Sequence, residues 1–181
     1  MGNAEVFISY HTKTGGDVVH KIVSILEKRG ITCWYAPRNV GDNYAHSIVK
    51  AIRGCRVFLL VLNKESNNSA HVLNEINCAF NRFKNHEDIV LLPFRIDSCD
   101  LSDDIYYYLG RIHIMDGVLP PEEIRIQELA ARISALLGKQ LVRAGKSIVA
   151  SLEKDDIEKT TYRLIGSMVY PDSSFIGRVF K

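Results

Sequence analysis

Short apolar runs alternate with segments of helical period between residues 5 and 138, and this alternation constrains the fold more than any other feature of the sequence. Strands are expected at residues 5–10, 32–35, 56–62, 89–96 and 111–115. The third and fourth of these are apolar at nearly every position, as strands covered by helices on both faces must be. The pattern predicts an α/β fold, a flavodoxin-like doubly wound parallel sheet of five strands in three layers, with strand order 2-1-3-4-5.

The segments between the expected strands carry apolar residues at helical spacing and end in residues that stop helices. Helices are expected at residues 18–26, 44–53, 70–82 and 122–136. Ser69 is a suitable N-cap for the third, and Pro121 suits the start of the fourth, in which Ile124 and Leu129 are expected to face inward. We therefore predict one domain over residues 1–138, followed by a C-terminal helical extension over 139–181 that is too short to be a second domain.

Charge and composition remove several classes of function. Lysine and arginine number 23 against 21 acidic residues, so the formal net charge of +2 gives no reason to expect a nucleic-acid partner. No apolar run approaches the roughly 18 residues that span a bilayer, and the first residues do not resemble a secretory signal, so we expect a cytoplasmic protein without a membrane partner. The four cysteines form no CxxC pair, and we expect free thiols and no metal site.

The loops that follow the strands are the places to look for a site, because ligands of open parallel sheets bind outside the carboxyl ends of the strands. The loop at residues 9–16 supplies hydroxyls, an aromatic ring and a cation. The loop at residues 36–43 carries Arg38, whose guanidinium suits a phosphate or a carboxylate. Either loop could equally be an ordinary solvated turn.

Glu75 is the main candidate for chemistry. It follows His71 by four residues on an expected helix, so both side chains project from one face. Its apolar neighbours would make ionisation costly without a partner. A half-exposed surface glutamate, with His71 as a packing or capping residue, is the alternative interpretation. A lone carboxylate would suffice for a substrate whose leaving group is already cationic and needs no proton.

Four blocks of sequence, in order and over about residues 3–138, resemble Toll/interleukin-1 receptor (TIR) domains. The first, Glu5–Tyr10, resembles the opening strand, and the second, Trp34–Gly41, resembles the second strand and the loop after it. The third, Ser69–Ile76, resembles the helix signature with serine followed by glutamate, and Tyr107–His113 resembles a segment typical of bacterial members. The sequence departs from the family at Asn39, where aspartate is common, and at His71, where tryptophan is common.

The resemblance implies an enzyme that cleaves the nicotinamide glycosidic bond of NAD, with NAD as substrate and no separate cofactor. Its products would be nicotinamide and ADP-ribose, or a cyclic or conjugated ADP-ribose signal of the kind used in bacterial antiviral defence. Glu75 would be the catalytic residue. The nucleotide site would be lined by Ser9, Tyr10, Arg38, Asn39, Asp42 and His71.

The resemblance also implies partners and leaves alternatives. Self-association through TIR contacts is expected, in which the second loop of one copy completes the pocket of the next, along with a downstream effector that senses the nucleotide product. A non-catalytic adaptor that acts only by docking to other TIR domains is the main alternative. A phosphoacceptor receiver domain would place acids where Ser9 and Tyr10 stand, and it is discarded; a nucleoside deoxyribosyltransferase remains a remote possibility.

Overall fold

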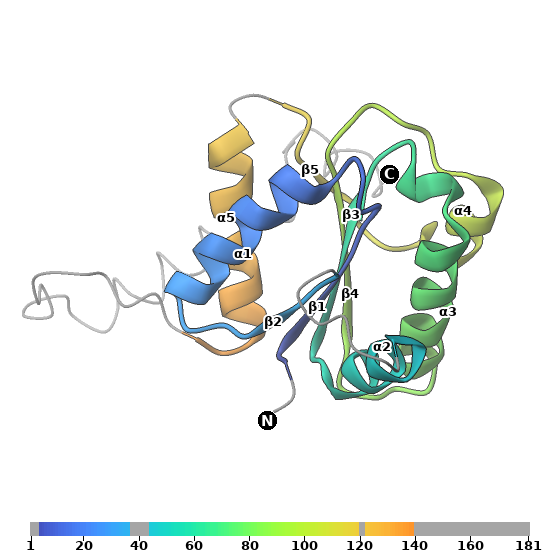
Figure 1. Ribbon diagram of the computed structural model, residues 1–181, viewed down its shortest axis with the longest axis horizontal. Coiled ribbons are helices and arrows are strands. Elements are labelled where there is room, and N and C mark those ends of the chain that lie inside the picture. The colour runs from blue at the N-terminus through green and yellow to red at the C-terminus, as the bar shows by residue number, and fades with distance from the viewer. Residues whose placement is uncertain (1–3, 37–43, 120–121, 140–181) are drawn as a thin grey trace, which may run out of the picture. The chain divides into compact units, whose positions relative to one another are not determined.

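The protein folds as a parallel sheet between two layers of helices in a computed structural model that describes residues 4–36, 44–119 and 122–139 (Figure 1). The strands are β1 (Val6–Ser9), β2 (Cys33–Trp34), β3 (Val57–Leu62), β4 (Val90–Arg95) and β5 (Met115–Asp116). The helices are α1 (Gly16–Lys28), α2 (Tyr44–Gly54), α3 (Ala70–Lys84), α4 (Asp103–Leu109) and α5 (Glu122–Leu136), with a 3₁₀ turn at Ser66–Asn68. The predicted α/β fold is confirmed. The predicted extension at 139–181 lies, apart from Lys139, outside the described residues.

The strand order is β2-β1-β3-β4-β5, with every neighbouring pair parallel, as predicted. The backbone amides of Val90 and Ile96 donate to the carbonyls of Arg56, which directly precedes β3, and of Leu62, the last residue of β3. The backbone N–H groups of successive strand residues point alternately to the two neighbouring strands. Those of Val90 and Ile96 point to β3, so the backbone nitrogen of Pro93 points to β5, whose ladder begins only at Phe94. The proline therefore removes no ladder hydrogen bond, which explains how it fits inside a central strand.

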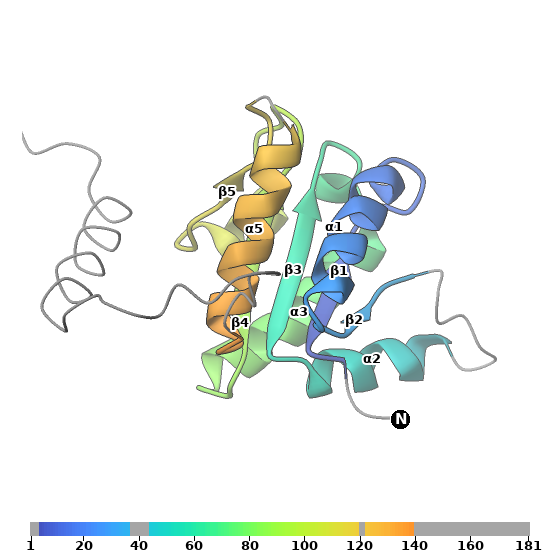
Figure 2. The same cartoon turned by 90° about the vertical axis from the view of Figure 1, so that its left-hand side faces the viewer.

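Each face of the sheet has its own apolar core. One face carries Val6 and Ile8 of β1 and packs against α1 and α5, which lie side by side on it in Figure 2. The other face carries Phe7 of β1 and packs against α2, α3 and α4 (Figure 1). Residue 9 therefore shares the face of Phe7, toward α3. Because side chains alternate between the two faces along β1, the side chain of Ser9 can reach α3 and not α1 or α5.

The end of the sheet differs from the prediction. The strand expected at residues 111–115 is wrong in its bounds, because β5 comprises only Met115 and Asp116. The residues before it form α4 (Asp103–Leu109), a helix that the sequence analysis does not predict. Ser102 caps α4 by accepting a hydrogen bond from the Ile105 amide, and the helix gives way at Gly110. Ile124, expected to face inward, is exposed, because α5 turns Ile126, Leu129 and Ile133 toward the core instead.

Three further observations concern what the described part of the chain contains. Its cysteines Cys33, Cys55, Cys78 and Cys99 are all free, with the first two buried and the others partly buried. Within the described residues no group of three or more potential metal ligands comes together. In the same residues, no helix has the length and apolar character needed to cross a membrane.

Gly117 stands where no side chain fits. A Cβ atom placed there would lie 2.4 Å from the Phe94 ring and 2.9 Å from the Arg95 carbonyl oxygen. We expect Gly117→Ala to lower the free energy of unfolding by about 1–3 kcal/mol through overpacking. Gly16→Ala is the matched control, because a Cβ atom there has no neighbour within 4 Å. Urea unfolding of both variants measures the difference, and equal stabilities would show that the β5 end of the sheet yields easily.

Candidate functional site

A cavity of about 460 Å³ opens at the carboxyl ends of β1 and β2. β2 lies on one side of β1, and β3, which follows β2 in the chain, lies on the other side of β1. The strand order therefore reverses between β1 and β3. Ligands of doubly wound sheets bind in the crevice at such a point. The cavity is lined by residues of β1 and the loop after it, of the β2 end, and of α3: Ile8, Tyr10, His11, Thr12, Lys13, Trp34, Ala36, Ser69, His71, Val72 and Glu75.

Glu75 projects from α3 toward the end of β1, where Ser9 meets it. The Ser9 hydroxyl donates a hydrogen bond to Oε2 of Glu75 over 2.5 Å. Ser9 is fully buried because its strand position faces α3, whereas Glu75 is half-buried and borders the cavity. The N-cap Ser69 fixes the start of α3 by accepting a hydrogen bond from the Val72 amide. The sheet and the helix cap together hold the carboxylate at the cavity wall.

Burial raises the pKa of the Glu75 carboxyl from its ordinary value of 4.5 to about 7, and the hydrogen bond from Ser9 acts against this rise. The cause is the loss of water around the charged form. Among the described residues, Ser9 alone offsets this effect with a hydrogen bond, and no described cation contributes. The site therefore holds a carboxylate that changes charge near neutral pH and that a bound cation would stabilise in its ionised form.

The lining of the cavity has an apolar part and a polar part. Trp34 and Val72 are buried and supply apolar surface, and the Trp34 indole stacks on the Phe7 ring with centroids 4.6 Å apart. Lys13 and His71 are exposed at the polar wall, each with a side chain able to meet an anion. The cavity thus offers an apolar surface beside the carboxylate together with basic groups at its edge.

The loop after β1 is held in place by hydrogen bonds on both of its sides. The Tyr10 hydroxyl donates to the carbonyl of Ala36, the last described residue before the second loop. Nδ1 of His11 lies 2.9 Å from the Thr14 hydroxyl oxygen, which in turn accepts a hydrogen bond from the amide of Asn63. Asn63 is buried after β3, so the loop is tied to the strands on either side of the crevice.

The structure brings together four of the residues proposed from the sequence. Ser9, Tyr10, His71 and Glu75 all lie at this cavity or directly beneath it. The other three proposed residues, Arg38, Asn39 and Asp42, lie outside the described residues.

Several lining residues were not singled out as site residues. His11, Thr12 and Lys13 belong to the first loop, whose hydroxyls and cation were noted without individual roles. Trp34 and Ser69 were assigned to a strand and a helix cap. The available signal was the position of residues 11–13 and of Trp34 at the carboxyl ends of β1 and β2.

The arrangement can bind a cationic group next to Glu75 more readily than it can bind a metal ion. A metal site in proteins needs several oxygen, nitrogen or sulfur ligands, and the described residues bring no such group together. An ionised carboxylate against apolar surface interacts strongly with a positive charge that develops beside it. Electrostatic stabilisation of a cation is therefore the chemistry that the geometry supports.

Comparisons with solved structures agree with the fold. The TIR domain of the Toll-related receptor TRR-2 from Hydra magnipapillata is 18% identical, with a TM-score of 0.57, covering 72% of this chain and 98% of that one. A TIR-STING receptor from C. gigas, solved in complex with 2′,3′-cGAMP, is 22% identical, with a TM-score of 0.56, and the match covers 71% of this chain and 40% of that one. At these identities the likeness shows the fold.

Sequence comparison assigns the family. None of the curated proteins compared with the chain matches it significantly. The family model described as "TIR domain" matches residues 6–130, which include β1, the cavity and Glu75. The chain therefore belongs to the TIR domain family.

Proposed function

We propose that the protein cleaves the bond between nicotinamide and ribose in NAD, with Glu75 as the catalytic residue. The observation that carries this proposal is the position of the Glu75 carboxylate, which borders the cavity and is held by the Ser9 hydroxyl over 2.5 Å. The membership in the TIR family supports the same function, as does the location of the cavity at the reversal of strand order.

The proposed reaction breaks the bond between the ribose C1′ and the nicotinamide nitrogen. The electron pair of this bond stays on the ring nitrogen, so the pyridinium leaves as neutral nicotinamide and needs no general acid. The ribose is left with a positive charge, and the Glu75 carboxylate stabilises this charge in the transition state. Water then attacks C1′ and gives ADP-ribose, or a nucleophile of the same or another molecule gives a cyclic or conjugated product.

The raised pKa of Glu75 fits this role. A carboxyl group with a pKa of about 7 is partly protonated in the empty site at neutral pH. A pyridinium ring bound beside it would favour the ionised form, because an opposite charge nearby lowers the pKa of an acid. The free energy lost by burying the carboxylate is thus compensated when the cationic substrate or transition state is present.

The product would act as a nucleotide signal for a downstream effector in bacterial antiviral defence, in the cytoplasm where NAD is available. This part of the proposal rests on the resemblance of the four sequence blocks to bacterial TIR enzymes. Asn39 and His71 depart from the family pattern, so the contacts around the nucleotide are expected to differ from those of other members.

Product analysis tests the proposed function. The full chain is incubated with NAD at high protein concentration, and the products are separated and weighed by mass spectrometry. We expect nicotinamide together with ADP-ribose or an isomer or conjugate of it. Intact NAD after incubation, combined with binding to other TIR domains, would favour the non-catalytic adaptor instead.

Self-association is part of the proposal. Tyr10 holds Ala36, from which the second loop begins, and this loop would complete the pocket of a neighbouring copy. A head-to-tail contact of this kind does not close on itself. We expect the specific activity for NAD cleavage to rise with protein concentration. Constant specific activity across a concentration series, with the oligomeric mass followed by light scattering, would contradict a shared site.

A further inference from the structure

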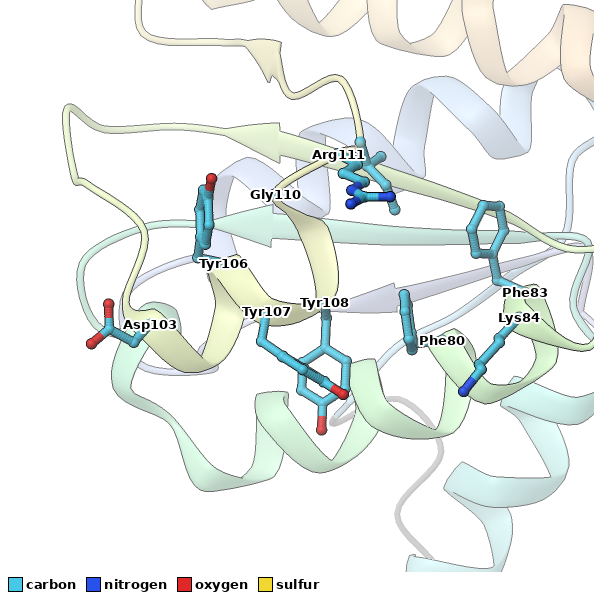
Figure 3. A pocket seen from close by; sticks show the side chains of 10 residues that line it. Phe80, Phe83, Lys84, Asp103, Tyr106, Tyr107, Tyr108, Gly110 and Arg111 are labelled. Atoms are coloured by element: carbon cyan, nitrogen blue, oxygen red, sulfur yellow. The ribbon is translucent and has the colours of Figure 1, made fainter.

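A second and larger cavity, of about 770 Å³, lies as a groove between α3 and α4, away from the Glu75 site (Figure 3). Its volume falls in the range of sites for small organic ligands. The groove is lined by five aromatic side chains, two cations and one acid, with Gly110 and Ile112 between them: Phe80, Phe83, Tyr106, Tyr107, Tyr108, Lys84, Arg111 and Asp103. Nothing in the proposed NAD chemistry uses these residues.

Four of the rings form a row across the groove. The ring centroids of Tyr107 and Tyr108 are 5.1 Å apart, those of Tyr108 and Phe80 5.3 Å, and those of Phe80 and Phe83 6.3 Å. At these distances the aromatic rings attract one another, so each ring restricts the movement of its neighbours. The rings meet at interplanar angles of 85°, 69° and 36°, so a planar ligand can stack on one exposed ring, such as Tyr107, and not on the whole row.

The aromatic surface is left open to solvent. Tyr107 is 76% exposed and Phe83 is 44% exposed, although large apolar side chains are usually covered. Tyr106 is 63% exposed, and its ring lies close over Gly110. Exposed apolar surface gathered in a hollow marks a binding groove.

The charges of the groove are separated along its length. Figure 3 shows Lys84 beside Phe83 at one end and Arg111 above the row, whereas Asp103 lies at the opposite end of α4. Within the described part of the chain, neither Lys84 nor Arg111 forms an ion pair or a side-chain hydrogen bond. Two cations without partners in the described part of the chain, next to a row of aromatic rings, favour a ligand that is both aromatic and anionic.

We propose that the α3–α4 groove binds a nucleotide, with its base stacked on the exposed ring of Tyr107 and its phosphates at Lys84 and Arg111. Every base has π faces that stack on aromatic side chains, and phosphates pair with lysine and arginine. An extended peptide fits this groove less well, because α3 and α4 use their backbone groups within the helices and leave few partners for a peptide backbone. The base is held by stacking, so the site selects for a ring with phosphates rather than for one base.

The test is a titration of the full chain with ADP, followed by amide chemical shifts in NMR spectra, which separate this groove from the Glu75 cavity. We expect ADP to shift amides of α4 and of residues 80–84. Adenosine, which lacks phosphates, and pyrophosphate, which lacks the ring, should each bind more weakly. The readout requires no turnover of NAD, so it stands or fails independently of the proposed function.

Substitutions in the groove test whether ADP binds there. Tyr107→Ala should weaken ADP binding by roughly 5- to 100-fold through loss of stacking, and Arg111→Gln should remove most of the preference for ADP over adenosine. Both residues are exposed, so neither change threatens folding. Arg132→Gln, a change at an exposed arginine on α5, is the matched control and should leave binding unchanged.

Three results would overturn the proposal. The first is the absence of α4 shifts at millimolar ADP, and the second is a set of α4 shifts that Tyr107→Ala leaves intact. The third is a change of oligomeric mass in the Tyr107→Ala variant without any nucleotide binding, which would identify the groove as a protein docking surface.

Discussion

Replacing Glu75 by glutamine is expected to lower the turnover of NAD by about a hundred- to a thousandfold, the usual cost of removing one well-placed electrostatic group from an active site. Glutamine keeps the size of the side chain and can still accept the hydrogen bond from Ser9, which is 2.5 Å long in the structure. What it removes is the negative charge beside the ribose. The effect should therefore appear in kcat, with a smaller change in KM.

Two comparisons make this prediction specific. Glu123→Gln removes an exposed carboxylate from α5, on the other face of the sheet, and should leave turnover unchanged. Ser9→Ala leaves the charge but removes its hydrogen bond, so it should raise the pKa of Glu75 further and shift the rise of activity to higher pH. Full activity in the Glu75→Gln variant would remove Glu75 from the reaction.

The same substitution is expected to stabilise the folded protein at alkaline pH. The pKa of Glu75 is about 7 in the folded protein, against an ordinary value of 4.5, so folding favours the protonated form. Stability from this group is fully present below pH 4.5 and is lost as the pH rises to about 7. The shift corresponds to at most about 3 kcal/mol, and solvent near the half-buried side chain reduces it to about 1–2 kcal/mol.

Urea unfolding at pH 5 and pH 8 measures this effect. Glu75→Gln resembles the neutral form at every pH, so it should exceed the wild-type stability at pH 8 and approach it at pH 5. Glu123→Gln should show no such pH dependence, because its carboxylate is exposed. A Glu75→Gln variant that is less stable than wild type at pH 8 would show that the carboxylate is held in the ionised form by groups other than Ser9.

The central strands could be predicted from the sequence because β1, β3 and β4 are short, largely apolar runs. Val57–Leu62 is buried at all six positions, and such a run fits only a strand covered on both faces. The strand order followed from the doubly wound class, since successive crossovers leave few arrangements.

The region around α4 could not be predicted in the same way. Tyrosine is enriched in strands, so the three consecutive tyrosines of Tyr106–Tyr108 concealed the helix. The signal that identifies α4 is local: Ser102 as N-cap, Asp103 and Asp104 in the first turn, and Gly110 at the end. The length of β5 depends on where β4 offers a free edge, which is a property of the fold and not of residues 111–116.

The candidate site was partly visible in the sequence. The four-residue spacing of His71 and Glu75 and the position of Ser9 at a strand end were readable, because a helix and a strand have fixed periods. The 2.5 Å contact between Ser9 and Glu75 joins residues 66 positions apart and depends on the packing of α3 against the sheet. The pKa of Glu75 follows from the same packing, so the direction of its shift could be predicted from the apolar neighbours, whereas the size of the shift could not.

The most direct test of the central claim is the release of nicotinamide from NAD labelled in the nicotinamide ring, measured with the wild-type chain and the Glu75→Gln variant at the same high protein concentration. We expect steady release by the wild type and release at least a hundredfold slower by the variant. Equal release by the two proteins, or none by the wild type at any concentration, would contradict the proposed role of Glu75.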